Sequence, residues 1–169
     1  KNKNLLLKNE NEIAKNYLLS ALLFSRKSNF VKSVEMFLKS IELANKNKNY
    51  SLLQKNYRGL ANAYLDQKNT DLALNYILKA QKLSKYNKDV SENAYINATL
   101  AEVYRLKGNY KQANKVFEKA YSDFKKNNEE HGQAYVLTNW SLCFENDITT
   151  LLKMELEAQE IWDKISPEN

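Results

Sequence analysis

The sequence repeats itself with a period of forty residues, and this spacing constrains the fold more than any other feature. Six columns of residues keep their physical type between copies: small, aromatic, capping, small, large apolar and small. The columns are Ala21/Ala61/Ala101/Ser141, Phe24/Tyr64/Tyr104/Phe144, Asn29/Asn69/Asn109, Ser33/Ala73/Ala113, Phe37/Ile77/Phe117 and Ser40/Ala80/Ala120. Such a chain is expected to stack similar structural repeats, because one repeat cannot bury its own apolar face.

Within one copy, the apolar residues have the spacing of helices. In residues 94–127, Ala101 and Tyr104 share one face of a first helix, because residues three or four apart are neighbours. Gly108 can end this helix in the left-handed conformation, and Asn109 can cap the next helix with its side-chain oxygen. Each copy is therefore predicted to be a pair of antiparallel helices joined by a tight turn.

We expect an all-α fold, a right-handed α-solenoid of about four stacked helix pairs in a single domain over residues 1–169. With only three Gly and one Pro, the chain is short of the turn formers that a β-sandwich or barrel needs. Ala158 and Trp162 lie 45 residues after Ala113 and Phe117, so the last helix departs from the spacing of forty. The expected repeats are 10–49, 50–89, 90–129 and 130–165, with first helices 10–27, 50–67, 90–107 and 130–147 and second helices 30–46, 70–85, 110–127 and 149–165.

The segment from Leu100 to Ala120 resembles a tetratricopeptide repeat. The small, Tyr, Gly, Ala, aromatic and Ala positions of that motif are Ala101, Tyr104, Gly108, Ala113, Phe117 and Ala120. The second copy matches with Ala61, Tyr64, Ala73 and Ala80, and the first copy matches more weakly. The repeats exceed the usual length of roughly 34 residues and resemble those of bacterial signalling and regulatory proteins. The resemblance covers about residues 14–165 and implies the fold rather than the function.

In this family the first helices line a concave groove that receives an extended peptide or a partner helix. Arg58 and Asn62 resemble two members of a clamp that holds a C-terminal carboxylate, whereas Thr99, Tyr135 and Asn139 stand where the clamp would need Asn, Lys and Arg. An ordinary solvated helix face stays open as the alternative. The residues expected on the groove side are Lys55, Arg58, Asn62, Tyr95, Glu102, Arg105, Tyr135 and Asn139.

The resemblance implies a non-catalytic scaffold that binds a protein or peptide. Because Glu102 would reject a uniformly acidic ligand, an amphipathic partner with a few acidic anchors is expected. One alternative is the sensory or regulatory segment of a larger signalling protein, a kinase or transcription regulator. Another is nucleic-acid binding through a Lys-rich edge, which the net charge of +6 would allow but the small number of Arg residues disfavours. The Lys edge comprises Lys46, Lys48, Lys85, Lys88, Lys125 and Lys126.

The residues that carry chemistry in enzymes are sparse. His131 is the only histidine and Cys143 the only cysteine, and no Gly-rich phosphate loop exists. We expect His131 to be solvated near a helix start and Cys143 to be a small buried apolar residue. The sequence therefore predicts no enzyme, no metal site and no cofactor.

The last helix carries more apolar residues than one neighbouring helix can cover: Leu151, Leu152, Leu156, Ile161, Trp162 and Ile165. We expect self-association there, or further helices after Pro167 in a larger parent protein. The longest apolar stretch, Tyr17 to Phe24, is too short to span a membrane. A cytoplasmic location is favoured, although no segment of the sequence names a compartment.

Overall fold

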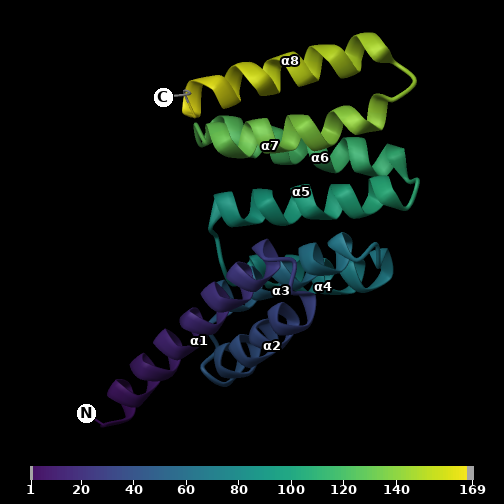
Figure 1. The fold of residues 1–169 in the computed structure, drawn as a ribbon. Helices are drawn as coiled ribbons and strands as arrows, with labels where there is room; N and C mark the ends of the chain where they lie inside the picture. The colour runs from purple at the N-terminus through teal and green to yellow at the C-terminus, as the bar shows by residue number, and fades with distance from the viewer. Residues whose placement is uncertain (1, 167–169) are drawn as a thin grey trace. The chain divides into compact units, whose positions relative to one another are not determined.

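The computed structural model describes the backbone of residues 2–166 and the side chains of residues 6–166. In this part of the chain every regular element is helical, as predicted (Figure 1). The elements are α1 (Asn2–Arg26), α2 (Phe30–Lys46), α3 (Tyr50–Asp66), α4 (Thr70–Lys82), the 3-10 helix η1 (Leu83–Lys85), α5 (Val90–Leu106), α6 (Tyr110–Lys126), α7 (Glu130–Ser141), the 3-10 helix η2 (Leu142–Phe144) and α8 (Ile148–Ile165).

The helices form two compact units, which divide between Lys88 and Asp89. In the N-terminal unit, α1 packs on α2 and α3 on α4, and α2 joins the two pairs by packing on α3. In the C-terminal unit, α5 packs on α6, α6 on α7 and α7 on α8. Each unit is therefore a stack of two consecutive helix pairs, and the packing of successive pairs on one another agrees with the repeat.

One type of turn recurs between the helices. The residue before the capping Asn has a left-handed backbone, which ends one helix before the next begins. The Asn side chain then accepts a hydrogen bond of 3.1–3.3 Å from the backbone N–H three residues later. This confirms the three predicted caps and adds Asn49, so the pairs of left-handed residue and cap are Ser28/Asn29, Lys48/Asn49, Lys68/Asn69 and Gly108/Asn109.

The repeated small and large apolar columns form the core, and every member of four of them is fully buried. In the first copy, two small positions are Ser rather than Ala. Ser33 Oγ donates to the carbonyl of Ala21 at 3.0 Å, and Ser40 Oγ donates to that of Ala14 at 2.7 Å. Because each buried hydroxyl donates to a carbonyl of α1, serine can replace alanine without leaving a buried polar group unpaired. The aromatic column of Phe24, Tyr64, Tyr104 and Phe144 is half-buried.

The predicted helix boundaries differ from the structure at the two ends of the chain. The first helix begins at Asn2 rather than near residue 10, and α7 ends at Ser141 and continues as η2 rather than reaching residue 147. Asp147 caps α8 through its contacts with Thr150, at 3.2 Å to the backbone N–H and 2.6 Å to the hydroxyl.

The cap also fixes the register of the last helix. Asp147 corresponds to Asn109, so Ala158 corresponds to Ala120 and is likewise buried. The spacing of 45 between Ala113 and Ala158 departs from forty because the structural counterpart of Ala158 is Ala120 rather than Ala113. Pro167, expected to end the helix, lies outside the described residues. None of the helices described combines the length and apolarity that a membrane span requires.

Candidate functional site

The eight predicted groove residues are divided between the two units. Lys55, Arg58 and Asn62 lie on α3 of the N-terminal unit. The other five lie in the C-terminal unit, with Tyr95, Glu102 and Arg105 on α5 and Tyr135 and Asn139 on α7.

In the N-terminal unit, a cleft of about 240 Å³ lies between α1 and α3, and all three predicted residues of this unit line it. Two further hollows share lining residues with this cleft. One of about 260 Å³ shares Leu18 and Lys55, and one of about 330 Å³ shares Ser25, Ala63 and Asp66. We call these three hollows together the α1–α3 groove. The remaining residues of the central cleft are Leu18, Leu22, Ser25, Arg26, Gly59, Ala63 and Asp66.

The spacing of the sequence explains how two helices supply this groove. Lys55, Arg58 and Asn62 are three and four residues apart and therefore share one face of α3. The side chains of Leu18 and Leu22 are spaced in the same way on α1. Because α1 contributes leucines beside Lys15 and Arg26, and α3 contributes two cations and an amide, apolar and positively charged groups meet in the groove.

The charges of the central cleft are mainly positive. Arg26, Lys55 and Arg58 line it together with one carboxylate, Asp66, and Lys15 lines the adjoining hollow. Arginine can hold a carboxylate through two parallel hydrogen bonds. The arrangement can therefore anchor an acidic side chain while apolar groups of the same ligand contact the leucines of α1.

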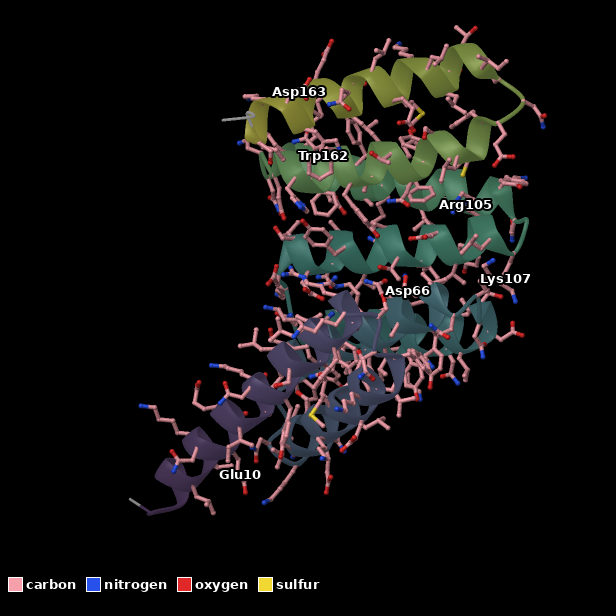
Figure 2. The ribbon with its side chains drawn as sticks, in the orientation of Figure 1. Glu10, Asp66, Arg105, Lys107, Trp162 and Asp163 are labelled. Carbon is pink, nitrogen blue, oxygen red and sulfur yellow. The ribbon has the colours of Figure 1, made fainter. Side chains whose placement is uncertain are left out.

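In the C-terminal unit, the two predicted tyrosines belong to an aromatic cluster. Tyr95 lies 4.7 Å from Phe124 and 6.2 Å from Tyr135, measured between ring centroids. Its hydroxyl lies 3.3 Å from Nδ1 of His131, whose ring meets Trp162 edge-on at 5.1 Å. Trp162 is labelled on α8 in Figure 2. These contacts join four helices of the unit, so the tyrosines have a packing role, and their contact with a ligand stays a prediction.

The remaining predicted residues of this unit have more local surroundings. Asn139 donates from Nδ2 to the carbonyl of Tyr135 at 2.9 Å, within its own helix. Arg105 is half-buried, and its Nε is buried with no hydrogen-bond partner among the described residues. Burial raises the pKa of the Cys143 thiol, and the charge of Arg105 offsets part of that effect. Cys143 is half-buried, where full burial was predicted.

Sequence reasoning missed the far end of the α1–α3 groove. Arg26 lies four residues after Leu22, and Asp66 lies four residues after the predicted Asn62, each on the same helix face as the earlier residue. Continuing the helical spacing by one turn would have found both. Both lie near the ends of the expected first helices 10–27 and 50–67, one turn beyond the residues assigned to the groove side.

The Lys edge makes several contacts within the chain. Lys46 forms an ion pair with Glu10 at 2.6 Å, whereas Lys85 lies over the ring of Tyr86 at 4.7 Å and Lys125 over that of Tyr121 at 5.6 Å. His131 is exposed at the start of α7, as predicted. Among residues 6–166, no three His, Cys, Asp or Glu side chains are placed to hold a metal ion.

Comparisons with known proteins agree with this architecture. A family model of the tetratricopeptide repeat (TPR) matches residues 51–126. The crystal structure of BtubC (BKLC) from P. vanneervenii has a TM-score of 0.61 and 19% identity, covering 94% of this chain and 74% of that one. The crystal structure of a candidate kinesin light chain from Podosopora anserina, with nearly identical TPR-like repeats, has a TM-score of 0.57 and 16% identity. The match covers 96% of this chain and 77% of that chain. A search of curated proteins finds no match.

At these identities the solved structures establish the fold alone, whereas the family model identifies the repeats themselves. Proteins of this family generally serve protein interaction and are generally not catalysts. A tetratricopeptide-repeat family model thus matches residues 51–126, and the chain has the TPR-like fold of stacked helix pairs.

Proposed function

We propose that the chain is a non-catalytic scaffold that binds a peptide segment of a partner protein in the α1–α3 groove. The observation that carries this proposal is the convergence of Lys55, Arg58 and Asn62 on one cleft with Leu18 and Leu22. Polar groups there would fix the position of the ligand, and the leucines would supply apolar contact area.

The groove favours an amphipathic ligand with acidic anchors. Leu22 and its neighbour Leu19 are exposed on α1 at 42% and 57%, so they offer apolar surface to a partner. Three cations around one cleft attract a carboxylate, and Asp66 opposes a ligand that is acidic throughout. In the C-terminal unit, we propose that Tyr95, Glu102, Arg105, Tyr135 and Asn139 supply further contacts to the partner.

A peptide selection followed by affinity measurements tests the proposal. Peptides selected from a random display library on the wild-type chain would be titrated by isothermal calorimetry. Replacing both Arg58 and Asn62 by Ala should weaken binding by roughly 1–4 kcal/mol, as truncation of central anchors does. The matched control replaces Lys85 and Lys125 by Ala and should leave the affinity nearly unchanged.

The control also tests the nucleic-acid alternative. If the Lys85 and Lys125 substitutions abolish binding while the groove substitutions are silent, the Lys edge is the site and the groove proposal is wrong. Binding through that edge would also weaken steeply with salt, because counterions are released when lysines neutralise phosphates. A role as a sensory segment would use the same groove and would appear as a change in an attached domain upon peptide binding.

We also propose that the chain self-associates through α8. Ile148, Leu152 and Leu156 follow one another at intervals of four residues and are exposed at 67%, 53% and 65%. They form an apolar stripe beside a hollow of about 650 Å³ that Leu152 and Leu156 line, and a second copy could cover it.

Sedimentation equilibrium should show a dimer that Leu156→Glu disrupts and Gln159→Glu, on an exposed neighbouring position, leaves intact. A wild-type chain that is monomeric at every concentration would contradict this.

A further inference from the structure

One end of the α1–α3 groove differs in chemistry from the rest. The hollow of about 330 Å³ beside the turn from α1 to α2 is lined by Ser25, Ser28, Phe30, Ala63, Asp66 and Gln67. Asp66 is the one charged side chain in this lining. The cations of the groove line the other two hollows instead. The groove is therefore bipolar, with positive charge along most of its length and a carboxylate at this end.

The carboxylate of Asp66 is unpaired within the part of the chain that the structure describes. It makes no hydrogen bond or ion pair there, even though Arg26 lines the same central cleft. Asp66 is the last residue of α3, which has no basic residue in its final turn, so the carbonyl end of the helix adds to the negative potential. Burial of part of the side chain raises the pKa of this carboxyl group. A bound cation would offset the negative potential at the helix end and would favour the ionised form of the partly buried carboxyl group.

The other lining groups suit an alkylammonium group. The hydroxyl oxygens of Ser25 and Ser28 and the amide oxygen of Gln67 can accept hydrogen bonds from its three N–H donors. Phe30 contributes an aromatic ring, and an aromatic face attracts a cation. Asp66 is labelled on the ribbon in Figure 2, at the end of α3.

We propose that this hollow, the Asp66 subsite, binds the protonated amine of a lysine side chain in the peptide that the groove holds. The inference rests on the proposed function, because it assigns the chemistry of one end of the same ligand. Arg58 takes an acidic residue of the peptide, and Asp66 takes the lysine. The two charges together fix the direction in which the peptide lies along the groove.

The geometry of α3 predicts the spacing of the two charges in the ligand. Arg58 and Asp66 are eight residues apart in one helix, which corresponds to about 12 Å at a rise of about 1.5 Å per residue. An extended peptide advances about 3.3 Å per residue. The lysine is therefore expected about four residues from the acidic residue.

Three small probes of similar size separate the chemistries: n-butylammonium chloride, sodium butyrate and n-butanol. Each would be titrated into the whole ¹⁵N-labelled chain while amide resonances are followed by NMR. Butylammonium should shift the resonances of Ser28, Asp66 and Gln67, and butyrate those of Lys55, Arg58 and Asn62. In the Asp66→Asn variant the response to butylammonium should be lost and that to butyrate kept. Glu118→Gln, which removes an exposed carboxylate from α6, is the matched control and should change neither response.

The outcomes distinguish the subsite from the groove. If Asp66→Asn responds to butylammonium like the wild type, or if butanol shifts the same resonances equally, the Asp66 subsite is wrong while the groove proposal survives. If butyrate leaves Lys55 and Arg58 unaffected, the groove proposal itself fails. Peptide selections identify the source of the amine. Wild-type selections should be enriched at least several-fold over Asp66→Asn selections in lysine about four residues from an acidic residue, and equal frequencies would overturn the lysine assignment.

Discussion

The ring of Phe37 in α2 occupies the space in which a side chain at position 59 of α3 would lie. A Cβ added to Gly59 would come within 3.0 Å of Cε1 and Cζ of Phe37. Phe37 is fully buried, so its ring has little room to move away. The absence of a side chain at Gly59 therefore lets α2 approach α3 directly beneath the groove.

This contact predicts that Gly59→Ala destabilises the protein. The added methyl group overpacks the contact with Phe37, and the expected cost is about 1–3 kcal/mol in urea denaturation. In a Phe37→Leu background the same change should cost less, because the smaller side chain leaves room for it. An equal cost in both backgrounds would contradict the steric explanation.

At the left-handed turn residues, introducing a glycine should stabilise the protein, whereas removing Gly59 should destabilise it. Lys68 has a φ of 57°, while the following N–H, of Asn69, donates to the carbonyl of Tyr64 at 2.9 Å. Lys68→Gly removes the steric strain of this conformation and should stabilise the protein by about 1 kcal/mol. Lys119→Gly, inside α6 and exposed, is the control and should destabilise by about 1 kcal/mol. A loss of stability in Lys68→Gly would be inconsistent with this account.

The small column of the repeat predicts a third effect on stability. Ala101 is fully buried in the core of the C-terminal unit, among Ala113 and Phe117. Ala101→Leu should therefore cost on the order of 1–3 kcal/mol through overpacking. Lys115→Leu adds a leucine at an exposed position of α6 and should be nearly neutral. Equal changes in the urea midpoint would disprove the assignment of the column.

The hydroxyl of Tyr121 donates to Oε1 of Glu157 at 2.5 Å, joining α6 to α8. Burial, and then the bond to this carboxylate, raise the pKa of Tyr121 from 10.0 to about 12. Because the protonated form is favoured in the folded state, this stabilisation is fully present below pH 10 and is lost as the pH rises toward about 12.

Urea denaturation of the wild type and of Tyr121→Phe would measure the effect. The difference in stability between them should be constant near neutral pH and should shrink between pH 10 and 12. Tyr110→Phe, at an exposed tyrosine of α6, supplies the control. A difference that does not depend on pH in this range would refute the role of the phenol proton.

The repeat made the helices, caps and core columns predictable, because each of these depends on local spacing. Asn29, Asn69 and Asn109 cap helices as expected, and Ala21, Ala61 and Ala101 are buried. The sequence could not reveal the packing role of Gly59, because its partner Phe37 lies in another helix.

For the candidate site, too, the sequence indicates only what depends on spacing within one helix. The face of α3 with Arg58 and Asn62 follows from helical spacing, and both residues line the groove. The position of Asp66 on this face follows from the same spacing, but the unpaired state of its carboxylate and the nearby end of α1 are contacts that no spacing along α3 reveals. The aromatic contacts of Tyr95 depend on α6 and α7 in the same way.

Hydrogen–deuterium exchange with a selected peptide bound tests the central claim most directly, because it locates the ligand without any substitution. The account predicts slower exchange in residues 15–26 of α1 and 55–66 of α3, which line the groove, and unchanged exchange in the Lys-rich joints at 45–48 and 125–128. Protection confined to those joints, with α1 and α3 unchanged, would contradict it.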